Sequence, residues 1–369
     1  MIKIISKLSL LAVLLLFSGC GGDNAFNGTG VIGSTASESQ VEVLESLQKN
    51  VLSAHAEALL KNIVELKTIV NGYDSNLTDN DVQTMKESFV TIMNEVKSVE
   101  AFYVATDFDI TMTQIKKINS FHTTKGLDVG ADVQRALNEN RDIRVALFKS
   151  SSKGISGLEY LLYGNNASND ELVHEMNKNN RRRIDAIKVS LEYLEGHASD
   201  IATFYANDTK FKADATDGAN AVVNALIDSA FKTKEWRIGE AAGIAAKYKD
   251  LADPSRLEFR NSALSLEAIK AILETHDDVL GVRSYTNFGS FASENGAADV
   301  VNKIRTKINE ALSLVNSMNT LESTIIKNRP VDGSVQKLYN TLKEIQELYF
   351  SSLIQALNLT AELIEADGD

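Results

Sequence analysis

Apolar residues recur every three or four positions over long stretches of this sequence, and that spacing limits what the chain can fold into. Between residues 79 and 105 the recurring positions are Val82, Met85, Phe89, Ile92, Val96 and Val99. Such spacing places the apolar side chains on one side of an α-helix. Only two prolines, Pro254 and Pro330, occur in 369 residues, which leaves room for long helices. Because no stretch shows the alternating pattern of a strand, we expect an all-α protein.

The helical pattern divides into two parts. Long helices are predicted at 40–70, 79–105, 168–206, 297–318 and 333–364, whereas 106–138 is predicted to be irregular. A polar segment near 205–217 interrupts the apolar spacing, and the chain is longer than one core usually fills. We therefore predict two helical-bundle domains packed against each other, at residues 39–208 and 214–369.

The first residues have the layout of a bacterial signal peptide. Residues 1–19 carry two lysines followed by a short apolar run, which is too brief to span a bilayer, since spanning takes about 20 residues. Residues 16–20 resemble a lipobox that ends at Cys20, the only cysteine. The alternative is an ordinary secretory signal and a chance cysteine. We expect a lipid anchor on Cys20, a flexible tether at 20–38 and, because Gly21 follows Cys20, sorting to the outer membrane.

One short apolar stretch, Gly154–Gly164, carries a carboxylate in an unexpected place. Glu159 lies four residues after Ile155 and three before Leu162, so it falls on the apolar face of a short helix. Ser156 lies three residues before Glu159 and shares a face with it. Burying a carboxylate is costly unless something pairs with it. We therefore expect Glu159 to have a specific partner or ligand.

The same stretch resembles the signature of the imelysin-like family, the insulin-cleaving metallopeptidase-like proteins. That signature is Gly-x-His-x-x-Glu followed by an aromatic residue, two leucines, an aromatic residue and glycine. The matching residues are Gly154, Glu159, Tyr160, Leu161, Leu162, Tyr163 and Gly164. Ser156 stands where the family has histidine. Since histidine is the commonest metal ligand, this departure predicts weaker or different metal binding.

Two weaker matches extend the resemblance to both halves of the chain. The segment 89–102 is similar to a family helix that ends in a glutamate, which would be Glu100 here, and 260–266 is similar to a second family motif that opens a helix. The resemblance implies two helical bundles, such as an ancient duplication would give, with a functional cleft between them. Glu100 and Glu159 would line this cleft, and Arg260 and Asn261 would face it.

His55 fills a gap in the apolar stripe of the first long helix. It is either a structural histidine with a satisfied hydrogen bond or a substitute for the histidine missing at Ser156. The candidate metal ligands are therefore Glu159, Glu100 and His55. Carboxylates suit ferric iron and other hard cations, so iron or another divalent or trivalent cation is the expected ligand.

Three functions remain open. The resemblance favours a non-catalytic binding lipoprotein that works with envelope components of iron uptake. The second is a structural or interaction lipoprotein without a ligand, in which Glu159 would pair with an arginine such as Arg260. The third is a metallopeptidase, which needs about three protein ligands for zinc; the five histidines are scattered, so no catalytic residue is assigned. A net charge of −12 argues against nucleic acid as a partner.

Overall fold

The structure is a computed structural model that describes residues 35–73, 76–122 and 128–361. Within these ranges the chain forms helices joined by loops and no strand, as the apolar spacing predicts. The predicted signal peptide, Cys20 and most of the tether lie outside the described residues. None of the described helices is long and apolar enough to cross a membrane.

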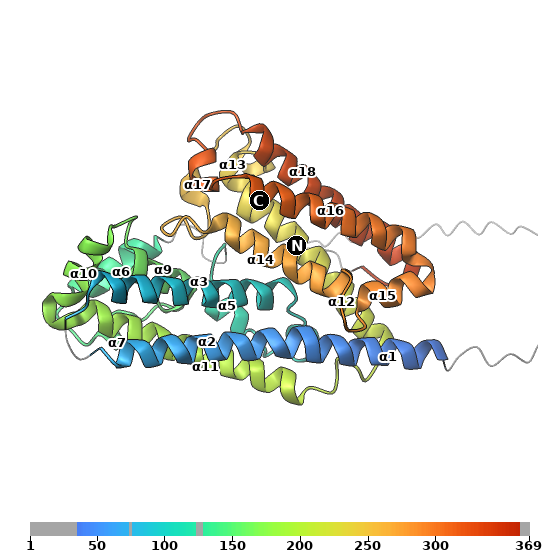
Figure 1. Cartoon of the computed structure of the whole chain (residues 1–369), viewed down its shortest axis with the longest axis horizontal. Coiled ribbons are helices and arrows are strands. Elements are labelled where there is room, and N and C mark those ends of the chain that lie inside the picture. The colour runs from blue at the N-terminus through green and yellow to red at the C-terminus, as the bar shows by residue number, and fades with distance from the viewer. Residues whose placement is uncertain (1–34, 74–75, 123–127, 362–369) are drawn as a thin grey trace, which may run out of the picture.

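The first half of the chain builds the lower layer in Figure 1. Its elements are α1 (Thr35–Leu47), the π-helical turn η1 (Gln48–Ser53), α2 (Ala54–Asn71), α3 (Asp79–Ala101), α4 (Ala105–Phe108), α5 (Gln114–Ile118), α6 (Val129–Asn138), α7 (Ile143–Ala146), α8 (Ser150–Lys153), α9 (Ile155–Tyr163), α10 (Asn169–Asn177), η2 (Asn179–Arg181) and α11 (Arg182–Asn207). The elements α1, η1 and α2 follow one another without a break. Helices α3 and α11 both pack along α2.

The second half builds the upper layer. Its elements are α12 (Ala215–Lys232), the π-helical turn η3 (Thr233–Gly239), α13 (Glu240–Ala242), η4 (Ala246–Tyr248), η5 (Pro254–Arg256), α14 (Ser265–Leu280), α15 (Phe288–Ala292), η6 (Ser293–Ala297), α16 (Ala298–Ser317), α17 (Leu321–Thr324), α18 (Gly333–Glu347), η7 (Leu348–Leu353) and α19 (Ile354–Leu357). Helix α14 packs against α3 below and α16 above, so it joins the two layers.

The predicted apolar stripes form the core. The six apolar positions of α3 are all buried. Thr78 and Asp81 form a capping box at the start of this helix, which satisfies main-chain N–H groups that have no partner within the helix. Buried apolar residues of both halves belong to one continuous core. The turn between α11 and α12 coincides with the predicted boundary, but the division into two domains stays a prediction.

Several boundaries differ from those predicted. The segment 106–138 contains α5 and α6, and the tether ends earlier because α1 begins at Thr35. The helix predicted at 168–206 is two helices, since Asn180 and Arg181 have φ values of 53° and 62°. Two consecutive left-handed residues end one helix and redirect the chain before the next. The last helix ends at Leu357 rather than 364.

Candidate functional site

A cavity of about 520 Å³ opens where the two layers meet. One wall comes from residues 120–159 of the lower layer, and the other comes from residues 240–261 of the upper layer. Four of the predicted cleft residues line it, namely Ser156, Glu159, Arg260 and Asn261. Segments far apart in the sequence thus build one site, as expected for a cleft between the two halves.

Helix α9 presents Ser156 and Glu159 to this cavity, and its glycines allow close packing behind it. A Cβ atom at Gly154 would lie 2.6 Å from the carbonyl oxygen of Ile118. Gly164 ends the helix with a φ of 60°, a left-handed conformation that favours glycine. Gly154 is therefore a packing residue and does not line the cavity.

A buried arginine, Arg183, stabilises the C-terminal end of α9, a role that the sequence did not indicate. Arg183 is buried, and its guanidinium donates to the main-chain oxygens of Leu161 and Tyr160 at 2.8 and 2.7 Å. The Tyr160 carbonyl also accepts from the main-chain N–H of Gly164, so the arginine adds to the main-chain cap at this end of the helix. The ring of Tyr160 packs on Gly130 rather than lining the cavity.

Glu159 joins the two layers through hydrogen bonds. It is 3% exposed, and it accepts from the main-chain N–H of Ser262 at 2.9 Å and from the Ser262 hydroxyl at 2.8 Å. The Asn261 amide lies 3.5 Å from its second oxygen. The suggested pairing with Arg260 is wrong, because Arg260 is exposed and makes no recorded bond to Glu159 in the described structure. A serine replaces the arginine as the cross-layer partner.

Burial controls the ionisation of Glu159. Desolvation raises the pKa of the carboxyl to about 7, although the hydrogen bonds from Ser262 and Asn261 favour the charged form and oppose this rise. The carboxyl is therefore partly protonated near neutral pH. In the unfolded chain its pKa returns to the ordinary value of 4.5.

This difference predicts a pH-dependent stability. Between pH 4.5 and 7 the folded chain keeps a proton on Glu159 that the unfolded chain has lost, so stability falls as pH rises through this window. Glu159→Gln removes the titration. From pH 5 to pH 8 the variant should gain about 2–3 kcal/mol of unfolding free energy relative to the wild type. Urea unfolding at both pH values measures this, and parallel profiles would contradict it.

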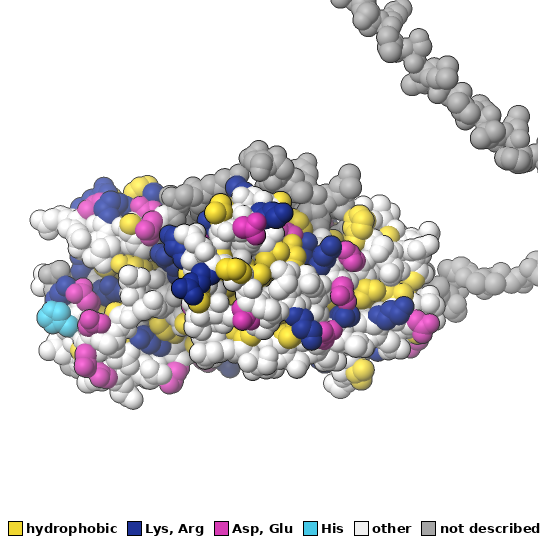
Figure 2. All heavy atoms as spheres, turned by 90° about the horizontal axis from the view of Figure 1, so that it is seen from above, with side chains coloured by type: hydrophobic (Ala, Val, Ile, Leu, Met, Phe, Trp, Pro, Cys, Tyr) yellow, Lys and Arg dark blue, Asp and Glu magenta, His cyan; other side chains and the backbone are white. Residues whose placement is uncertain are grey.

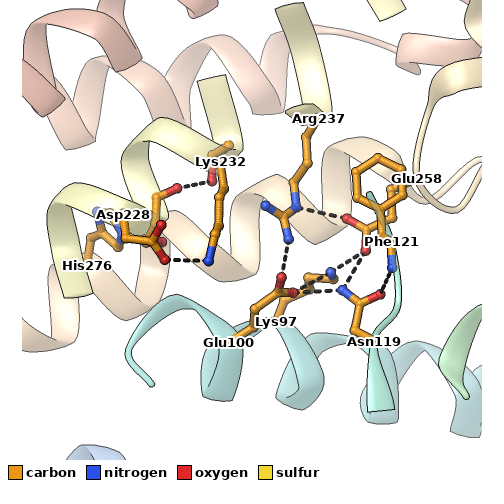
Figure 3. Close-up of polar contacts among 11 residues, drawn as sticks. Lys97, Glu100, Asn119, Phe121, Asp228, Lys232, Arg237, Glu258 and His276 are labelled. Atoms are coloured by element: carbon orange, nitrogen blue, oxygen red, sulfur yellow. Dashed lines mark hydrogen bonds and ion pairs between the residues drawn. The ribbon is translucent and has the colours of Figure 1, made fainter. Parts of the chain in front are cut away.

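Glu100 lies behind the cavity wall, in a cluster that also contains Lys97, Asn119, Arg237 and Glu258 (Figure 3). We call these five residues the buried charge cluster. Lys97 pairs with Glu100 at 2.7 Å and also with Glu258. Arg237 pairs with Glu100 at 2.7 Å and with Glu258 at 2.8 Å. The two carboxylates thus face two cations, and the cluster links both layers.

The cluster changes the expected role of Glu100. Burial opposes its ionisation, but Arg237 and Lys97 outweigh this effect and hold the pKa of Glu100 well below its usual range. Glu100 is not among the residues that line the cavity, whereas Glu258 is. The expectation that Glu100 lines the cleft is therefore corrected: Glu258 stands in the wall, and Glu100 supports it from behind.

His55 lies at a different contact between the layers. Its Nδ1 is 2.8 Å from Glu95, and its Nε2 is 3.5 Å from Asp278. Burial lowers its pKa, but the bonds to Asp278 and Glu95 outweigh burial and raise the pKa to about 9. A histidine must be neutral to bind a metal. The described contacts therefore match the structural histidine rather than the substitute ligand.

The three candidate ligands do not form one metal site. Glu159 is bonded to Ser262, Glu100 belongs to the buried charge cluster, and His55 bridges Glu95 and Asp278. Nowhere in the described ranges do three His, Cys, Asp or Glu residues gather in a way that could hold a metal ion. The residues present do not fit a resident metal, and the proposed ligand set is corrected accordingly.

Some residues of the site carried no clear signal in the sequence. Lys97 and Glu258 are charged residues without a distinctive motif, and their partners are far away in the chain. Ser262 resembles a helix cap, yet α14 begins at Ser265 without a side-chain cap. Glu100 is the member of the cluster that the sequence did single out, through the similarity of segment 89–102 to a family helix that ends in a glutamate.

Comparisons with known proteins agree with this architecture. The chain resembles an imelysin-like protein from Psychrobacter arcticum 273-4, with 17% identity and a TM-score of 0.63 over 89% of this chain and 98% of that one. It also resembles a protein from Parabacteroides distasonis ATCC 8503 named a "putative iron-regulated protein A precursor", with 10% identity and a TM-score of 0.67 over 87% of this chain and 95% of that one. No curated protein sequence matches. The Imelysin family model matches residues 51–349, and the chain therefore belongs to the imelysin family.

Proposed function

We propose that this chain is a non-catalytic binding protein of the bacterial envelope, anchored through Cys20, that holds its ligand in the cavity between the layers. The observation that carries the proposal is that both layers supply the walls and that Glu159 connects them through Ser262. Binding sites of small ligands commonly lie in such clefts between structural units. The iron-regulated name of the Parabacteroides neighbour supports a link to iron uptake.

The side chains of the cavity favour binding over peptide hydrolysis. A hydrolytic zinc site takes about three protein ligands and a water molecule. At this cavity Ser156 offers a hydroxyl, which is a poor metal ligand beside imidazole. Glu258 is already ion-paired with Lys97 and Arg237. The donor set thus supports recognition of a ligand rather than activation of water.

Iron retention tests this function. The full-length chain in detergent is loaded with either a ferrous salt or ferric citrate, desalted, and assayed for bound iron. We expect saturable retention of one of these forms. Ser156→Trp fills the cavity and should weaken retention at least tenfold, whereas Ser317→Trp, at an exposed position near the end of α16, should leave it unchanged. Retention of neither form would contradict the proposal and favour the structural or interaction protein.

A further inference from the structure

The cavity presents unpaired positive charge, although the whole chain has a net charge of −12. Lys247, Arg256 and Arg260 line the upper wall. None of these three cations forms an ion pair with a carboxylate in the described part of the chain. The Arg256 guanidinium donates to main-chain oxygens of Leu251 at 2.6 Å and Glu240 at 3.2 Å, and these contacts leave its charge uncompensated.

The four carboxylates that line the two walls, in contrast, each have a partner within the protein. Glu258 pairs with Lys97 and Arg237 in the buried charge cluster. Asp128 accepts from the main-chain N–H of Ala131 as the cap of α6. The two remaining carboxylates, Glu240 and Glu159, are bonded to His122 at 2.7 Å and to Ser262 at 2.8 Å. Each of these carboxylates is thus held by a partner within the protein, whereas Lys247 and Arg260 are exposed and make no hydrogen bond or ion pair in the described ranges, so these cations are the charged groups available to a ligand.

Aromatic contacts hold side chains of both walls in place. The Arg256 guanidinium lies over the ring of Tyr248 at 4.0 Å. His122 stacks on Trp236, with ring centres 4.1 Å apart and an interplanar angle of 7°. Figure 2 shows the face of the molecule seen from above, where Lys and Arg side chains lie among Asp and Glu side chains. Fixed cations lose less conformational entropy on binding than free ones.

We propose that the ligand of this cavity is a small anion with several carboxylate or phosphate groups, bound by Arg256, Arg260 and Lys247. The inference rests on the proposed binding function and names its ligand class. Arginine binds carboxylate and phosphate through paired N–H groups, and the exposed Arg260 is free to do so. Iron would then enter as an anionic chelate.

A bare cation fits this cavity less well. It would meet three like charges, and the wall carboxylates are already engaged by their own partners. Repulsion between like charges is stronger near a protein surface than in bulk water, because the effective dielectric constant is lower there. An anionic chelate brings its own metal ligands, so it needs from the protein only the positive charge that this wall supplies.

Calorimetric titration of the full-length chain tests the inference. The probes are sodium citrate, sodium pyrophosphate, ferric citrate, ferrous salt and zinc chloride, at low ionic strength. We expect citrate or pyrophosphate to bind. The one that binds more tightly shows whether the cavity prefers carboxylate or phosphate groups. Arg260→Glu should weaken that binding at least tenfold, whereas Arg260→Lys should retain most of it. Lys303→Glu makes the same charge change at an exposed residue of α16 outside the cavity and should have little effect.

Two outcomes would overturn the inference. Binding of ferrous or zinc ions without binding of any anion would show that the cavity takes cations, while the binding function itself would stand. An equal loss of anion affinity in Arg260→Glu and Lys303→Glu would show that only the overall charge matters. Failure of the binding function is separate, because neither iron form would then be retained.

Discussion

Lys97→Met is expected to lower the free energy of unfolding by about 3–5 kcal/mol, because removing one partner of a buried ion pair leaves an uncompensated charge. The Lys97 side chain is 0% exposed, and without it Glu100 and Glu258 share only Arg237 as a cation. Methionine preserves most of the volume, so the loss reflects charge rather than a cavity. Urea unfolding at pH 7 measures the effect.

Two controls separate this effect from a general response to losing a lysine. Lys61→Met changes a side chain that is 72% exposed and that forms a loose surface ion pair with Glu65, at 3.7 Å. Because exposed ion pairs contribute little, this change should alter the free energy of unfolding by no more than about 0.5 kcal/mol. The double variant Lys97→Met with Glu258→Gln leaves Glu100 paired with Arg237. It should be more stable than the sum of the single changes predicts. If the effects of the two single changes on the free energy of unfolding simply add, Lys97 and Glu258 do not interact as the buried charge cluster requires.

Gly157→Ala is expected to cost about 3 kcal/mol, at the upper end of what overpacking usually costs. The new Cβ would lie 2.1 Å from the carbonyl oxygen of Ser152, and a main-chain atom cannot move aside as a side chain can. Helix α8 would have to separate from α9, and this would displace Ser156 and Glu159. Thermal unfolding and iron retention should therefore both decline.

Gly196→Ala is the matched control for this change. Gly196 lies exposed within α11, and a Cβ there would meet nothing within 4 Å. Alanine is the better helix former, so this variant should be more stable than the wild type by about 0.5–1 kcal/mol. Equal effects of the two glycine changes would contradict the close packing of α8 on α9.

The sequence predicts most of the helices because burial repeats with the helical period. The apolar stripe of α3 was readable from local spacing, and all six of its predicted positions are buried. The position of Glu159 on the apolar face of α9 likewise indicated its burial. These features depend on residues within one or two helical turns, so they need no knowledge of the tertiary structure.

The partners across the layers could not be predicted in this way. Ser262 reaches Glu159 because Phe259 and Ala263 adopt φ values of 57° and 56°, which such residues seldom do. Lys97 is buried only because Arg237 and Glu258, more than a hundred residues away, complete its cluster. Such contacts depend on how the layers pack, and local patterns do not encode that packing.

A crystal structure of the full-length chain grown with ferric citrate, with anomalous scattering recorded at the iron edge, tests the central claim most directly. We predict an iron peak inside the cavity, with citrate oxygens between the iron and Arg260. A peak outside the cavity, or iron bound by three or more protein side chains without citrate, would contradict the account.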